Sequence, residues 1–120
     1  MGTASGIWRV TDRATFDALR SGQRAQAGAV SVTYLPAPPG QPAPRAAFQV
    51  GRRTGSAVVR NRIRRRLRAG LRELRQRGAL PAGTYLVGGR RELADQPWAD
   101  LQRDLAAAVA QASRPPGGTG

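Results

Sequence analysis

Residues 57–77 read AVVRNRIRRRLRAGLRELRQR, and their pattern decides how the middle of the chain folds. Apolar residues recur there at the three- and four-residue intervals of one helical face, namely Ile63, Leu67, Leu71 and Leu74. The spacing predicts an amphipathic helix from about Ala57 to Arg77, with Ser56 as N-cap and Gly78 beyond its end. Arginines fill most other positions and repel one another, so such a helix favours an external polyanion as its partner.

The composition of the whole chain supports this inference. Twenty arginines and no lysines stand against seven acids in 120 residues, a formal net charge of +13. Nucleic acid is the simplest partner for that charge, and an anionic membrane surface is the weaker alternative. The exclusive use of arginine is weak evidence by itself, because the excess of Ala, Gly and Pro is typical of a GC-rich genome.

Several classes of function are excluded or disfavoured. The chain has no Cys and no His, which excludes thiol nucleophiles, imidazole bases and zinc sites built from them. No Lys follows the glycines at 51 and 55, so a phosphate-binding P-loop is absent. Asp100 and Asp104 flank Arg103 and are interpreted as salt-bridge partners, and Trp98 is interpreted as a core anchor. We therefore expect no catalytic residue and no metal ligand in the protein.

The flanking segments follow an α+β pattern. A first helix is predicted at 11–19, and period-two alternation predicts strands at 29–35 and 46–50, separated by a proline-rich loop. A further strand is predicted at 84–87 and a last helix at 97–112. Because a strand, the long helix and a strand follow one another, the strands at 46–50 and 84–87 are predicted to be parallel neighbours.

The same alternation assigns the two faces of the sheet. One face is predicted to be buried and carries Val30, Val32, Tyr34, Phe48 and Val50. The other face is small and polar, suits a shallow groove, and carries Ser31, Thr33, Ala47 and Gln49. We expect one domain over residues 1–112, followed by a disordered tail at 113–120. No apolar run approaches the length of about 20 residues that a membrane span needs, so a cytoplasmic protein is expected.

Residues 48–68, FQVGRRTGSAVVRNRIRRRLR, resemble the signature of the protein subunit of bacterial ribonuclease P. That signature is a strand, a basic pair, a turn and a helix that begins with Arg-Asn-Arg. Looser matches are Arg9, Phe16, Gly22, the segment GTYLV at 83–87 and Arg90. The chain departs from the pattern at Ser56, where the family usually has Asn, at Gly70 inside the helix, and at Arg91, where Pro is frequent.

The resemblance implies a fold and a role. The fold is a compact two-layer α/β sandwich with a mixed sheet and a left-handed βαβ crossover, against the usual right-handed preference. The role is that of the protein subunit of an endonuclease holoenzyme for tRNA processing, in which a catalytic RNA removes the 5′ leader of precursor tRNA. The protein alone is not catalytic and binds no cofactor, the RNA partner requires Mg²⁺, and no obligate protein partner is expected.

The resemblance also assigns two groups of site residues. Contacts with the catalytic RNA are implied for Arg52, Arg53, Arg60, Asn61, Arg62, Arg64, Arg65 and Arg68. The groove for the single-stranded leader is implied for Phe16, Thr33 and Gln49, with Arg52 nearby. Thr33 and Leu19 replace residues that are often aromatic in relatives, which predicts weaker stacking on the leader. A structural RNA-binding protein of the ribosomal type, and a protein-only nuclease, are the alternatives.

Overall fold

The computed structural model describes residues 8–10, 13–37, 40 and 43–114. Its strands are β1 (Trp8–Arg9), β2 (Gln23–Ala27), β3 (Val30–Pro36), β4 (Arg45–Gln49) and β5 (Gly83–Gly89). Its helices are α1 (Arg13–Leu19), α2 (Ala57–Gln76) and α3 (Trp98–Ala112), with short 3-10 turns η2 (Arg52–Thr54) and η3 (Arg91–Ala94). The first two residues of the helix predicted at 11–19 lie outside the described residues, as does the tail from residue 115.

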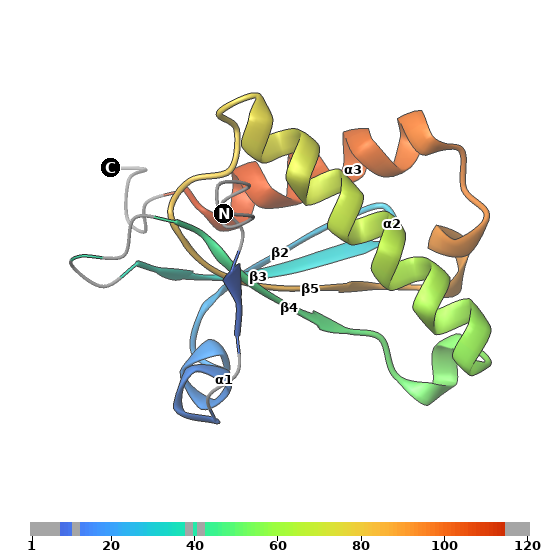
Figure 1. Cartoon of the computed structure of the whole chain (residues 1–120), viewed down its shortest axis with the longest axis horizontal. Coiled ribbons are helices and arrows are strands. Elements are labelled where there is room, and N and C mark those ends of the chain that lie inside the picture. Colours follow the sequence, from blue (N-terminus) through green and yellow to red (C-terminus); the bar gives the residue numbers. More distant parts are fainter. Residues whose placement is uncertain (1–7, 11–12, 38–39, 41–42, 115–120) are drawn as a thin grey trace.

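The strands form one mixed sheet in the order β1-β4-β5-β3-β2. β4 and β5 are parallel, as the sequence predicts, whereas β5, β3 and β2 pair in antiparallel fashion. Helices α2 and α3 cover one face of the sheet, and the short α1 lies on the opposite side (Figure 1). The α+β class and the sandwich of helices on a mixed sheet are therefore confirmed. The left hand of the β4-α2-β5 crossover stays a prediction.

The apolar stripe of α2 packs into the core as its spacing predicts. Its four predicted core side chains are at most 1% exposed, namely Ile63, Leu67, Leu71 and Leu74. Ser56 caps the helix, its side chain accepting a hydrogen bond from the Val59 amide at 3.3 Å. Gly78 follows the helix with φ of +73°, the left-handed conformation that ends many helices. Sequence and structure therefore agree on where α2 begins and ends.

Gly70 explains how α3 approaches α2 so closely. A Cβ atom at this position would lie 2.6 Å from Leu105 Cδ2 and 2.7 Å from Gln102 Oε1, both on α3. The Gln102 amide donates to Glu73 Oε1 at 2.5 Å and, more weakly, to the Gly70 carbonyl at 3.4 Å. The glycine that weakens the isolated helix thus allows the two helices to pack together.

Phe48 and Tyr34 lie on the predicted core face and pack against the core, but both are less buried than predicted. Phe48 is only half-buried, because β1 pairs with just Arg45 and Ala46 and leaves β4 as an edge strand at Phe48. Tyr34 is also half-buried, with its hydroxyl donating to the Ala82 carbonyl at 2.8 Å. The valines at 30, 32 and 50 are buried as predicted.

The strand β2 was not predicted at all. Its side chains alternate between the core-packed Ala25 and Ala27 and the exposed Arg24 and Gln26. Alanine is a weak strand former, so the alternation of small and polar residues carries little propensity signal. Pairing with β3 therefore places this segment in the sheet. In the described part of the chain, no helix is long and apolar enough to cross a membrane.

Candidate RNA-binding surfaces

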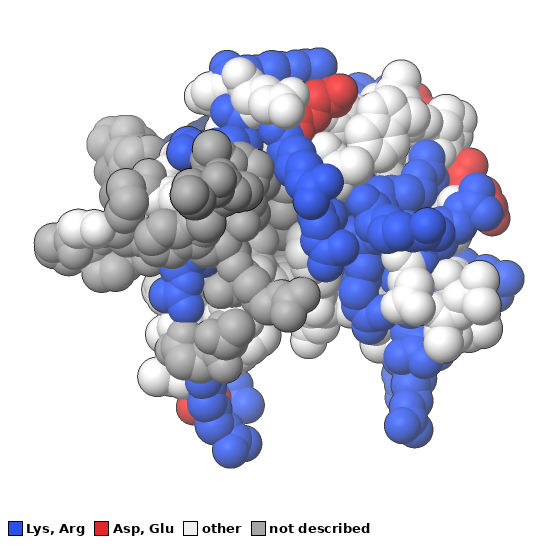
Figure 2. Space-filling view, viewed as in Figure 1, with Lys and Arg blue, Asp and Glu red and all other residues white. Residues whose placement is uncertain are grey.

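Four of the predicted RNA-binding residues share one exposed side of α2. These four residues are Asn61, Arg64, Arg65 and Arg68, and we call them the arginine surface. They line a shallow hollow together with Val58, which is 77% exposed. Arginine side chains run along α2 in the space-filling view (Figure 2). Guanidinium groups on successive turns of one helix can each fork two phosphate oxygens of a nucleic acid.

Asn61 acts within this surface by orienting an arginine. Its Oδ1 accepts a hydrogen bond from Arg64 Nη1 at 2.8 Å, while Arg64 Nη2 reaches the Val50 carbonyl at 3.4 Å. Arg64 is therefore held between its own helix and the end of β4. Such preorganisation reduces the side-chain entropy lost when a phosphate binds.

The other arginines of the predicted helix take different positions. Arg62 lines a neighbouring hollow, and Arg60 is half-buried with a buried Nε for which the described residues provide no hydrogen-bond partner. Arg66 donates to the carbonyls of Leu93 and Gln96 at 2.5 and 2.6 Å. Arg66 is thus a structural residue that ties α2 to the segment before α3, consistent with its absence from the predicted RNA contacts.

Trp98 is not the core anchor that the helical spacing predicts. It is 38% exposed, and the Arg66 guanidinium carbon lies 5.8 Å from its ring centroid. Pro97 and Trp98 begin α3, where the chain has just left η3, so the ring falls at the rim of the α2–α3 contact. Leu101, Leu105 and Val109 on the same helix are buried.

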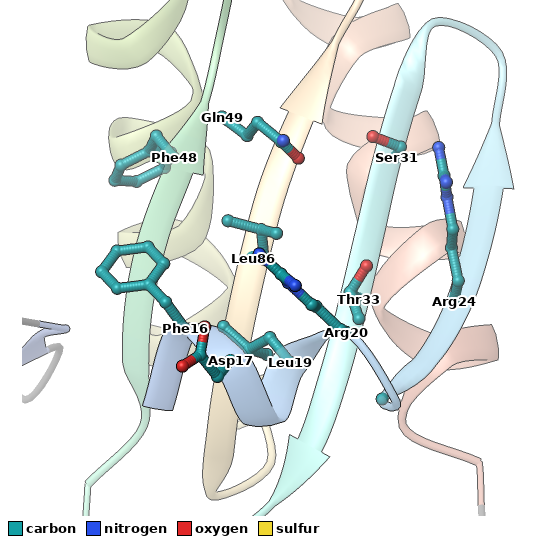
Figure 3. A pocket seen from close by; sticks show the side chains of 11 residues that line it. Phe16, Asp17, Leu19, Arg20, Arg24, Ser31, Thr33, Phe48, Gln49 and Leu86 are labelled. Atoms are coloured by element: carbon teal, nitrogen blue, oxygen red, sulfur yellow. The ribbon is translucent and has the colours of Figure 1, made fainter. Parts of the chain in front are cut away.

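A groove lies on the sheet face opposite α2 and α3. The three residues predicted for leader binding, Phe16, Thr33 and Gln49, all line it, and its cavity volume is about 430 Å³. Figure 3 shows Phe16 projecting from α1 towards the side of the groove that β4 forms, with Arg24 of β2 at the other side. We call this the sheet groove.

The structure adds groove residues that the sequence did not reveal. Arg20 and Arg24 supply positive charge, Asp17 a single carboxylate, and Leu86 an apolar floor between β3 and β4. Phe48 provides a second aromatic ring beside Phe16, so the groove is less poor in aromatic residues than its Thr33 suggests. Tyr34 makes no such contribution, because it pairs with Tyr85 on the core face, with ring centroids 5.2 Å apart.

The sheet groove continues towards the start of α2. A second hollow shares Arg24, Ser31 and Gln49 with it and is further lined by Arg52, Arg53 and Arg90. Arg90 Nη2 donates to the Gly28 carbonyl at 3.2 Å, and this hydrogen bond holds the Arg90 side chain at the edge of the second hollow. The predicted pair Arg52 and Arg53 thus belongs to this end of the groove and is not in the hollow of the arginine surface.

The two surfaces meet at β4. The Arg68 guanidinium of the arginine surface lies 5.3 Å from the ring centroid of Phe48, which also lines the groove. A nucleic acid in the groove and another on α2 would therefore lie on adjoining sides of the same strand. This arrangement suits a protein that holds two RNA segments near each other.

Acidic residues form no competing site in the described structure. Arg103 pairs with both Asp100 and Asp104 at 3.3 Å, confirming their interpretation as salt-bridge partners. No group of three or more acidic residues could hold a metal ion among the described residues, and the sequence has no His or Cys. The fold and the two arginine-rich surfaces are those of an α+β domain suited to binding a nucleic acid.

Comparisons with known proteins identify which family of this class is present. The ribonuclease P family profile matches residues 7–113. The ribonuclease P protein component of Thermobifida fusca is 40% identical over 117 residues, covering 91% of this chain and 78% of that protein. The corresponding protein of Thermus brockianus is 39% identical, covering 82% of this chain and 55% of that protein.

Solved structures agree on the fold. The ribonuclease P protein of Staphylococcus aureus superposes with a TM-score of 0.74 at 20% identity, covering 88% of this chain and 95% of that one. The Thermotoga maritima protein gives a TM-score of 0.69 at 23% identity, with coverages of 84% and 94%. The chain therefore belongs to the ribonuclease P protein family, whose members are subunits of a holoenzyme in which RNA carries the catalysis.

Proposed function

We propose that this chain binds the ribonuclease P RNA through its arginine surface and the 5′ leader of precursor tRNA through its sheet groove. The observation that carries this proposal is the meeting of the two surfaces at β4, where Arg68 of one lies over Phe48 of the other. A leader held in the groove is thereby brought beside the catalytic RNA held on α2. Removal of the leader then takes place on the RNA, in the cytoplasm.

The protein contributes electrostatics and position to this reaction. Close approach of two RNA molecules is opposed by phosphate repulsion, which the arginines on both surfaces reduce. The groove suits a single strand, since Phe16 and Phe48 offer rings for stacking while Arg20 and Arg24 offer charge. The Mg²⁺ that leader hydrolysis requires would be held by the RNA, and neither a cofactor nor a second protein is required in this proposal.

The test is cleavage of a precursor tRNA at low Mg²⁺ by the protein alone, by a bacterial ribonuclease P RNA alone, and by the mixture. Cleavage that is strong only in the mixture supports the proposal. Cleavage by the protein alone would indicate a protein-only nuclease. Tight binding without stimulation would instead indicate a structural RNA-binding protein.

Salt dependence provides a second test. If about five arginines of the chain contact phosphates, the three of the arginine surface among them, log K should fall with log salt with a slope of roughly −3.5 to −4.5. A slope near zero would contradict the arginine surface as the main contact.

A further inference from the structure

Trp98 occupies an exposed position that the contacts proposed above leave unexplained. Trp98 is 38% exposed, whereas the later apolar side chains of α3, among them Leu101 and Leu105, are buried. Beside it lies a hollow lined by Arg62, Arg65, Arg66, Ala69 and Trp98, with a cavity volume of about 430 Å³. The hollow is shallow and open, so it can contact one part of a larger ligand.

The ring is held in place from within the protein. Arg66, whose guanidinium lies 5.8 Å from the ring centroid, is itself fixed by the carbonyls of Leu93 and Gln96. Trp98 therefore stands at the rim of the hollow against a cation that cannot easily move away. A preorganised aromatic ring loses little side-chain entropy when a flat ligand stacks on it.

The positive charge of the hollow beside Trp98 and its continuity with the arginine surface indicate which ligand binds there. Arg62 and Arg65 are exposed at the same hollow, and Arg65 also belongs to the arginine surface. A polyanion seated on that surface would thus extend directly to Trp98. Because aromatic stacking beside arginines is the usual way in which proteins hold an unpaired base, RNA fits this hollow.

We propose that Trp98 stacks on an unpaired nucleotide of the ribonuclease P RNA, with Arg62 and Arg65 binding the adjoining phosphates. This inference rests on the proposed function and adds a base contact to an interface otherwise made of phosphate contacts. The contact anchors the RNA on the side of α2 away from the sheet groove.

The first experiment follows the fluorescence of Trp98 in a Trp8→Phe protein, which leaves one tryptophan. Stacking of a base should quench the emission when a bacterial ribonuclease P RNA is added to saturation. The Trp98→Phe protein, which retains only Trp8, measures any signal from elsewhere. RNA that binds with salt-sensitive affinity but leaves Trp98 emission unchanged would overturn the stacking contact while leaving the proposed function intact.

The second experiment compares Trp98→Leu with Trp98→Phe and Arg62→Gln. Trp98→Leu should weaken RNA binding about tenfold, as expected for one lost stack, without changing the salt slope. Trp98→Phe should recover most of that affinity, and Arg62→Gln should reduce the slope by about 0.7–0.9. Urea unfolding of each variant separates stability from binding. Equal affinities for the wild type and a folded Trp98→Leu protein would overturn the inference.

Discussion

The arginine surface and the sheet groove differ in how many elements build them. The arginine surface lies on one helix, so residues three and four apart in the sequence are neighbours in space. The groove draws its lining from α1, β2, β3, β4 and β5, whose residues are scattered between positions 16 and 86. A site within one element can be predicted from spacing alone, whereas a site between elements depends on strand order and register.

The largest effect should come from reversing charge on the arginine surface. Arg64→Glu with Arg65→Glu should weaken binding of the ribonuclease P RNA at least about a hundredfold, since each lost charge-assisted contact is worth about 1.5–3 kcal/mol. The measurement is a binding titration at fixed salt. Arg13→Glu with Arg114→Glu, which makes the same change in net charge away from α2, is the matched control. Equal losses in both proteins would show that only total charge matters.

Within the same helix, substitution of Arg66 should lower the stability of the fold, whereas substitution of Arg65 should weaken RNA binding. Arg66→Ala removes the donors of two hydrogen bonds to half-buried carbonyls and should lower the free energy of unfolding by about 2 kcal/mol. Arg65→Ala, at an exposed position, should change it by less than about 0.5 kcal/mol. Urea denaturation of both variants checks this contrast, which fails if the two midpoints coincide.

The groove should respond independently of the arginine surface. Phe16→Ala removes an exposed ring and should weaken binding of precursor tRNA to the holoenzyme about tenfold, the loss expected for a stacked base. Binding of mature tRNA, which has no leader, should be unchanged, as should binding of the catalytic RNA. An equal loss for mature tRNA would place Phe16 outside the leader contact.

The helix and the groove also show where prediction from sequence succeeds. The boundaries of α2, its N-cap at Ser56 and its buried stripe follow from periodicity and capping chemistry, and all three are confirmed. The parallel pairing of β4 with β5 follows from the order of elements and is confirmed too. The resemblance supplies the groove residues Phe16, Thr33 and Gln49, and the structure brings these together.

Prediction fails where a residue's environment depends on distant parts of the chain. The exposure of Trp98 depends on where α3 begins relative to α2, and that of Phe48 on how short β1 is. Helical spacing placed Arg62 and Arg66 on the polar surface alike, but only the structure shows that Arg66 reaches two carbonyls beyond η3. Gly70 is likewise explained only by a distant residue, because a Cβ atom there would clash with Leu105, which lies 35 positions further along the chain.

The smallest effect should appear when the pH is changed. Stability, which depends on the core, should respond to alkaline pH, whereas RNA binding by the two surfaces should not. The hydroxyl of the fully buried Tyr85 donates to the Pro81 carbonyl at 2.6 Å. Burial raises the pKa of Tyr85 above its ordinary value, and the neighbouring Tyr34 raises it further. Folding therefore favours the neutral phenol. This stabilisation is complete below the unfolded pKa of about 10 and is lost as pH rises through the folded pKa.

A guanidinium group is charged throughout the interval from about pH 6 to 9, and the chain has no His or Cys. RNA affinity should therefore be level between about pH 6 and 9, while stability falls only above about pH 10. Tyr85→Phe should cost about 1 kcal/mol at neutral pH through the lost hydrogen bond and make the alkaline decline shallower. Urea denaturation across pH measures both. An affinity that changes between pH 6 and 9 at constant stability would contradict an RNA interface whose charge comes from arginine alone.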